Sequence, residues 1–391
     1  MHSRAYLSNR PSRFALGHRL LFGAPVAGAR ASGAPKCALW ASGAGVPPST
    51  SPAPRSRRST GRPNPWIATR LHGHRLATDL RLLARDGVFS TPDAERHGLD
   101  RHALTRLCRA GRIVRLTRGW YAVTDGAAPD GEALHRLCAL ALGRQFRSRA
   151  VISHHSLLLC RGLPTFRADL ATVHLASVDP GTSGSPGRSS RGAGVRRPGL
   201  VMHRPVRGLG LSAPSVEDHR PAGMPLEHAI VQAGLLGGPE AALVPADAAV
   251  RAASVDAARL ERAVADLRTH SGIGPVRAAL AFVDGRHESP GETRTAYVLR
   301  CLGFELEPQY EVRAEGRRFR ADFRVLGTRV LVEFDGASKY ADGRRETLFE
   351  EKRREDALRR AGWVVVRLMW ADLDRPEQVR RLVAEAVACA A

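Results

Sequence analysis

The sequence predicts an α/β protein of several domains: a winged helix, a middle α/β connecting domain, and a C-terminal mixed sheet flanked by helices. The chain has 391 residues, more than one usual domain, and its hydrophobic fraction of 43% supports ordinary cores. Residues 76–125 have the pattern helix, short helix, helix and hairpin. Residues 286–391 have the pattern helix, strand, strand, helix and strand, which gives an α/β core.

The start of the chain has a different composition. Residues 1–70 are rich in Pro, Ser and Arg and show no hydrophobic periodicity, so we expect a disordered leader. Residues 1–75 contain twelve basic and no acidic side chains, which is more than half of the net charge of +22. The charge favours a polyanionic partner, but most of it lies outside the predicted domains.

Residues 76–125 predict a winged helix-turn-helix. Asp79 caps a first helix, Ser90 or Thr91 caps a short second helix, and a third helix runs from about Arg101 to Ala110. "RIVRLTRGWYAV" then predicts a hairpin that turns at Arg118 and Gly119. In a winged helix the third helix enters the major groove, and we expect the DNA contacts from its outer side and from the wing. The expected contact residues are Arg101, His102, Thr105, Arg106, Arg109, Arg115 and Arg118.

An alternative is that these arginines simply cover the surface of a small helical unit, since residues 76–125 have a net charge of only +3. The stretch "GVFSTPDAERHGLDRHALTRLCRAGRIVRLTRGWYAV" resembles the N-terminal domain of AbiEi-type antitoxins of type IV toxin–antitoxin systems. The resemblance covers about fifty residues. It implies binding to operator DNA and a cognate toxin as a further partner.

Residues 130–285 predict a connecting domain of helices and strands without assigned chemistry. "TVHLASV" and "LVMHRPV" alternate as strands around a loop rich in Gly, Ser and Arg. His154, His155 and Ser156 stand together, but no acidic residue accompanies them at a spacing typical of a catalytic triad or a metal site. We therefore interpret these histidines as structural.

The C-terminal region, residues 286–391, contains acids within a predicted strand pair. In "FRADFRVLGTRVLVEFDG", period-two spacing places Glu333 and Asp335 on one face, within reach of Asp322 on the preceding strand. Carboxylates on a sheet are costly unless they are paired or bind a cation. Converging acids on rigid strands suit Mg²⁺ or Mn²⁺, which can polarise a phosphoryl oxygen.

Five segments in order, "SPGETR", "RADF", "LVEFDGASKY", "EEKRREDALRRAGW" and "VVRLMWADL", resemble the PD-(D/E)XK nuclease superfamily. The closer likeness is to its domain-of-unknown-function 559 group, relatives of very-short-patch-repair endonucleases. The resemblance covers about residues 286–375 and implies a restriction-endonuclease-like fold. It also implies Glu292, Asp322 and Glu333 as the acidic, metal-binding site residues.

The superfamily places lysine two residues after the second acid, where this chain has Asp335. The chain holds only three lysines, and two of them, Lys339 and Lys352, follow the acids closely. Either could be catalytic, and Lys352 is favoured because a helix packed on the sheet can aim it at the acids. Arg354 could clamp a phosphate. Alternatively, the helix is solvated, and the acids pair with Arg329 or Arg353.

These patterns lead to two functional hypotheses. In the first, the protein binds double-stranded DNA and cleaves it as a Mg²⁺- or Mn²⁺-dependent endonuclease. In the second, it is an antitoxin-type transcriptional autorepressor whose nuclease-like domain is silent. Widely spread cysteines without a CxxC pair suggest a reduced, cytoplasmic setting, and no apolar run is long enough to span a membrane.

Overall fold

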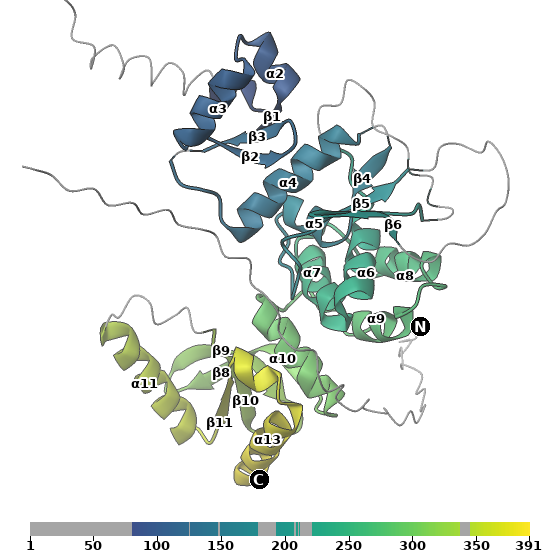
Figure 1. Cartoon of the computed structure of the whole chain (residues 1–391). Helices are drawn as coiled ribbons and strands as arrows, with labels where there is room; N and C mark the ends of the chain where they lie inside the picture. Colours follow the sequence, from purple (N-terminus) through teal and green to yellow (C-terminus); the bar gives the residue numbers. More distant parts are fainter. Residues whose placement is uncertain are drawn as a thin grey trace, which may run out of the picture. The chain divides into compact units, whose positions relative to one another are not determined.

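The computed structural model (Figure 1) describes most of the chain from residue 80 onwards. The predicted leader, the capping residue Asp79 and the candidate catalytic Lys339 lie outside the described residues. Within the described part, no helix combines the length and the apolar character that a membrane span requires. The described residues are 80–124, 126–147, 149–178, 193–206, 209, 211, 221–336 and 345–391, with the side chains of 193 and 345–349 left out.

Residues 80–124 form a winged helix around a small apolar core. Ser90 caps the second helix, which is one of the two predicted caps, and Asp100 caps the third. Leu104 and Leu107 of the third helix point inward at 2% and 8% exposure. The structure adds a short strand before the second helix, which pairs with the second strand of the wing. The elements are β1 (Val88–Ser90), α2 (Thr91–Arg96), α3 (Arg101–Arg109), β2 (Ile113–Thr117) and β3 (Trp120–Val123), in the antiparallel order β1-β3-β2.

The middle region combines a four-stranded sheet with a group of helices that share one apolar core. Its sheet has the order β4-β5-β7-β6, in which β5 and β7 are parallel and the outer pairs are antiparallel. The strands are β4 (Ala150–Ile152), β5 (Val173–Ser177), β6 (Ala193–Arg197) and β7 (Leu200–His203). The helices are α4 (Gly131–Gln145), α5 (His154–Cys160), α6 (Leu226–Gly237), α7 (Pro239–Arg251), α8 (Ala257–Asp266) and α9 (Ile273–Leu280).

The C-terminal region is a mixed sheet between helices, as predicted. Its order is β11-β10-β9-β8, and only β10 and β11 are parallel. Figure 1 shows α11 on one side of the sheet and α10 and α13 on the other. One apolar cluster joins the sheet to α10 and α13, while a second joins it to α11. The elements are α10 (Pro290–Cys301), β8 (Leu306–Ala314), β9 (Arg317–Val325), β10 (Val330–Phe334), α11 (Arg345–Arg360), β11 (Val364–Leu368), α12 (Trp370–Leu373) and α13 (Pro376–Ala390).

The strand β8 is an addition to the sequence prediction. It pairs with β9 on both sides of Gln309 and forms one edge of the sheet. Its sequence, "LEPQYEVRA", contains a proline and two glutamates, which are unfavourable in a central strand. An edge strand tolerates Pro308 because one side of its backbone needs no ladder partner.

Close packing of Gly291 against Phe334 fixes the start of α10 on the sheet. A Cβ atom at Gly291 would lie 2.0 Å from the Phe334 ring, well inside van der Waals contact. Phe334 in turn packs edge-on against Trp370, with ring centroids 4.9 Å apart. Only glycine therefore allows the present distance between α10 and β10.

We expect Gly291→Ala to destabilise the protein by about 1–3 kcal/mol, because the Phe334 ring must move to admit the methyl group. Gly274→Ala is the matched control, since a Cβ there meets nothing within 4 Å in the short helix α9. The control should be neutral or stabilising by up to about 1 kcal/mol. Chemical denaturation of both variants measures the difference, and equal stabilities would contradict this account of Gly291.

Candidate DNA interface and acidic site

The α3 surface carries every side chain that the sequence predicted for DNA contact on that helix. Its apolar side chains enter the core, so the polar ones are left on the outer side at three- and four-residue spacing. No acidic side chain lies in its first turn, and Arg106 and Arg109 lie in its last turn, where the helix dipole favours cations. The exposed residues are Arg101, His102, Thr105, Arg106 and Arg109.

The wing adds two more cations. Arg115 on β2 and Arg118 in the following turn are both exposed. The turn is tight because Gly119 adopts a positive φ of 76°, which glycine allows without strain. Two separate elements, α3 and the β2–β3 hairpin, therefore present basic side chains to solvent.

Arg144 of α4 ties the winged helix to the middle region. Its guanidinium donates hydrogen bonds to the backbone oxygens of Arg85 and Val88 and to the Asp86 carboxylate, the last at 2.6 Å. The side chain is largely buried, at 11% exposure, so these partners compensate the cost of burying its charge. This contact holds the strand β1 beside α4.

In the C-terminal sheet, Asp322 and Glu333 lie where β9 and β10 separate. The ladder between the strands ends at the pair Val332 and Phe323, so these two acids are the next residue on each strand. The Asp322 carboxylate then accepts a hydrogen bond from the backbone N–H of Phe334 at 2.7 Å. The structure therefore brings these two predicted residues together at one point of the sheet.

Arginines rather than lysines surround Glu333. Arg354 of α11 donates hydrogen bonds to both carboxylate oxygens of Glu333. Arg367 is the partner of Glu333 on β11, and its Nε lies 3.8 Å from the Glu333 carboxylate. Lys352 lies on the exposed side of α11, two residues before Arg354. Asp335 is half-buried just after β10, and its backbone N–H donates to the Leu368 oxygen.

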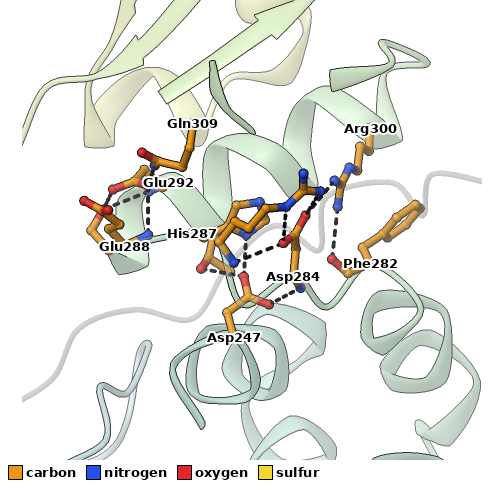
Figure 2. Close-up of polar contacts among 11 residues, drawn as sticks. Asp247, Phe282, Asp284, His287, Glu288, Glu292, Arg300 and Gln309 are labelled. Atoms are coloured by element: carbon orange, nitrogen blue, oxygen red, sulfur yellow. Dashed lines mark hydrogen bonds and ion pairs between the residues drawn. The ribbon is translucent and has the colours of Figure 1, made fainter. Parts of the chain in front are cut away.

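The predicted ligand Glu292 is already engaged in hydrogen bonds (Figure 2). Its carboxylate accepts from the Ser289 hydroxyl and the Glu288 backbone, an arrangement that caps α10, and from the Gln309 amide at 2.8 Å. Gln309 was absent from the sequence prediction. It lies on β8 at a positive φ of 56°, at the position across from Asp322.

The oxygen atoms of this acidic site meet some, but not all, of the requirements of a hydrated divalent cation. The amide oxygen of Gln309 is buried without a hydrogen-bond partner, which is unusual for a buried acceptor. The carboxylates of Asp322 and Glu333, like this amide oxygen, are hard ligands of the kind that Mg²⁺ or Mn²⁺ prefers. Nevertheless, within the described ranges no three acidic side chains converge closely enough to hold an ion by themselves.

A buried polar network joins α7 to the segment before α10 (Figure 2). Asp247 of α7 accepts hydrogen bonds from the His287 ring at 2.6 Å, the Thr293 hydroxyl and the backbone N–H of Asp284. Burial raises the pKa of Asp284, but hydrogen bonds from Arg286 outweigh this effect and hold the pKa at about 2. Asp284 therefore stays ionised in the folded protein well into the acidic range.

The low pKa of Asp284 predicts an acid-sensitive contribution to stability. Above its ordinary pKa of 3.8 the group is ionised in both states, so its contacts count fully. As the pH falls from about 4 to 2, the unfolded chain takes up the proton first, and roughly 1–2 kcal/mol is lost. Asp284→Asn should lower the free energy of unfolding at pH 7 and flatten this window in acid-unfolding curves, whereas the exposed-site control Glu305→Gln should leave the curve unchanged.

Comparison with known proteins finds a family that the N-terminal domain resembles. A family model described as a transcriptional regulator, AbiEi antitoxin, matches residues 79–124, the segment that folds as the winged helix. The winged helix is thus similar to the domain of antitoxin-type transcriptional regulators.

Two curated relatives cover much more of the chain. The uncharacterized protein MT2308 of Mycobacterium tuberculosis strain CDC 1551 / Oshkosh is 31% identical over 262 residues, 66% of this chain and 88% of its own length. The uncharacterized protein Rv2248 of strain ATCC 25618 / H37Rv matches equally. This chain belongs to the family of these mycobacterial proteins.

Proposed function

We propose that this protein is a transcriptional regulator that binds duplex DNA through its winged helix. The observation that carries the proposal is the exposed basic side of α3, which presents Arg101, Arg106 and Arg109. The same side presents His102 and Thr105, whose side chains can form hydrogen bonds. The match of this segment to the antitoxin regulator family supports it independently. The operator of its own promoter and a cognate toxin are the partners that this class implies.

The geometry suggests how the binding energy divides. Residues near the start of α3 reach base edges in the major groove, where a guanidinium can bind guanine with two hydrogen bonds. Arg115 and Arg118 of the wing are placed for phosphate contacts, which fix the register without reading sequence. Binding should accordingly weaken steeply as salt increases.

Arg106→Ala should weaken binding to the protein's own promoter fragment by about 1–3 kcal/mol. Arg118→Ala should weaken binding to specific and to non-specific DNA by the same factor. It should also reduce the slope of log affinity against log salt concentration by about one. Fluorescence anisotropy at several salt concentrations measures both effects. Arg380→Ala on α13 is the control, because that exposed arginine lies outside the winged helix. If all three variants bind like the wild type, α3 and the wing are not the interface.

We infer a second activity for the C-terminal domain, metal-dependent hydrolysis of a DNA phosphodiester. It is favoured by one observation: Asp322 and Glu333 are adjacent where β9 and β10 separate. Gln309, at the position across from Asp322 on β8, adds a buried amide oxygen without a hydrogen-bond partner. These oxygens would hold Mg²⁺ or Mn²⁺. When bound, such an ion polarises a phosphoryl oxygen and makes a water more nucleophilic.

The surrounding side chains would position the DNA. Arg354 contacts Glu333 in the present structure, and it can exchange this carboxylate for a phosphate oxygen when the acid turns to an ion. Lys352 on the exposed side of α11 and Lys339 beyond β10 remain candidates for an approach to the backbone of the DNA. Asp335 and Glu292 are then supporting acids, the latter through its bond to Gln309.

Purified protein incubated with supercoiled plasmid and Mg²⁺ should nick it, and Asp322→Asn should reduce the rate by at least about 100-fold, since removal of a group that stabilises charge in the transition state has this effect. The Asn amide oxygen can still accept the hydrogen bond from the Phe334 backbone, so this contact is retained. Glu305→Gln, an exposed acid, is the matched control.

Equal nicking by the wild type and Asp322→Asn would reveal a contaminating nuclease and defeat the cleavage assignment. Absence of nicking with Mg²⁺ and with Mn²⁺, while promoter binding is retained, would leave the regulator alone. The C-terminal domain would then be a silent scaffold.

A further inference from the structure

The middle domain brings three histidine rings together from separate elements. His154 begins α5, His174 lies on β5 and His203 ends β7, and one nitrogen from each ring lies within 4.8 Å of the others. His154 and His174 are buried and His203 is half-buried. The rings of His154 and His203 stack with centroids 3.9 Å apart. This is the one group of three potential metal ligands in the described part of the chain.

We propose that His154, His174 and His203 form a binding site for Zn²⁺, with three imidazole ligands and an open fourth position. Three neutral histidines are a common ligand set for Zn²⁺, and the fourth position then takes a water or another small ligand. Nitrogen donors without carboxylates also discriminate against Mg²⁺ and Ca²⁺, which prefer oxygen.

The distances require little movement. Nδ1 of His174 and Nε2 of His203 lie 2.8 Å apart. Two nitrogens bound tetrahedrally to one Zn²⁺ at about 2.0–2.1 Å are about 3.3–3.4 Å apart, so these rings need to separate by about half an ångström. An imidazole can move its proton to the other ring nitrogen, and both facing lone pairs then point to the ion.

The surroundings orient the rings as the outer contacts of a metal site do. Nδ1 of His154 hydrogen-bonds to the Ser153 hydroxyl at 2.9 Å, and with Nδ1 as the donor its Nε2 keeps a lone pair. The Ser156 hydroxyl accepts from the backbone N–H of His174 and also bonds to His135. These contacts fix α5 against β5 before any ion arrives.

Two further features support the site. The backbone of His154 has a positive φ of 52°. Residues other than glycine rarely adopt this conformation, and where they do it is frequent at ligand-binding positions. Burial, followed by repulsion from neighbouring histidines, lowers the pKa of His174 to about 3, and burial with nearby Arg196 lowers that of His203 to about 4. Both shifts favour the uncharged imidazole, which is the form that binds metals.

Neighbouring histidines are engaged elsewhere. His135 uses both ring nitrogens, one toward the Leu170 oxygen and one toward Ser156, and His155 bonds to the Asp169 oxygen. Within the described part of the chain, His154, His174 and His203 are the group of three whose nitrogen atoms lie within 4.8 Å of one another. An ion there would link α5, β5 and β7 and fix the end of β7 against the domain core.

The full chain without a polyhistidine tag, stripped with a chelator, should bind one equivalent of Zn²⁺ in calorimetric titration. Co²⁺ should bind at the same site and give the visible absorption of a four-coordinate ion with nitrogen ligands. Thermal unfolding should shift upward in the presence of Zn²⁺, because the ion binds only the folded chain.

Single substitutions His203→Ala and His174→Ala should weaken Zn²⁺ binding by more than about 100-fold, beyond the usual effect of outer contacts. His228→Asn, a buried histidine outside the cluster, and His97→Asn, an exposed one, are the controls and should bind like the wild type. Since His203 is half-buried, its variant should fold, which circular dichroism checks.

Failure of the stripped wild type to bind Zn²⁺ or Co²⁺ would overturn the proposal. So would one-equivalent binding that survives in His203→Ala and His174→Ala. Asp322→Asn should leave the Zn²⁺ stoichiometry unchanged, which separates this site from the acidic one.

Discussion

The contact between Gly291 and the Phe334 ring determines where α10 meets the sheet, and the rest of the C-terminal domain follows from it. Phe334 stands between Glu333 and Asp335, so the helix start and the acids cannot shift independently. Next to that contact, Glu292 reaches Gln309 on β8. On the same helix, buried Arg294 pairs with Glu240 and Asp374. The "SPGETR" motif therefore serves packing and buried charge pairing first, and any chemistry builds on that arrangement.

Arginines and a metal ion compete for Glu333, and this competition distinguishes the nuclease hypothesis for the C-terminal domain from the silent-scaffold hypothesis. Its carboxylate is compensated by Arg354 and Arg367, and a buried acid with two cations has no need of a metal. Under the nuclease hypothesis, the Glu333 carboxylate must give up its ion pair with Arg354. Substrate binding must then offset the free energy lost with that pair. A phosphate between the strands would supply that compensation, because it offers Arg354 another anion. DNA and a divalent ion are thus expected to assemble the site together, whereas a silent scaffold would keep the ion pairs.

The sequence predicted the elements whose signals are local, and it missed those that depend on tertiary contacts. The helix caps and the inward leucines of α3 follow from periodicity and capping chemistry, and the structure agrees. On α11, helical phase could have been used further, because Arg354 shares its side with buried Ala357 and Leu358, while Lys352 lies on the other side. Strand β8 was missed since its charges and proline suit only an edge. The sequence drew attention to His154 and His155 but not to the histidine cluster, because His174 and His203 come from two other elements separated by loops.

The two candidate metal sites use different chemistry in different domains, and this separates their consequences. Oxygen donors beside Asp322 suit an ion that keeps most of its water, such as Mg²⁺, which loses water reluctantly. Imidazole nitrogens on α5, β5 and β7 suit Zn²⁺, and Mg²⁺ does not compete for them. An ion held by three side chains from distant parts of the sequence stabilises the fold that presents them. An ion at the histidine site would therefore act on the connecting domain, which Arg144 links to the winged helix, whereas an ion at the acidic site would act on a bound phosphodiester.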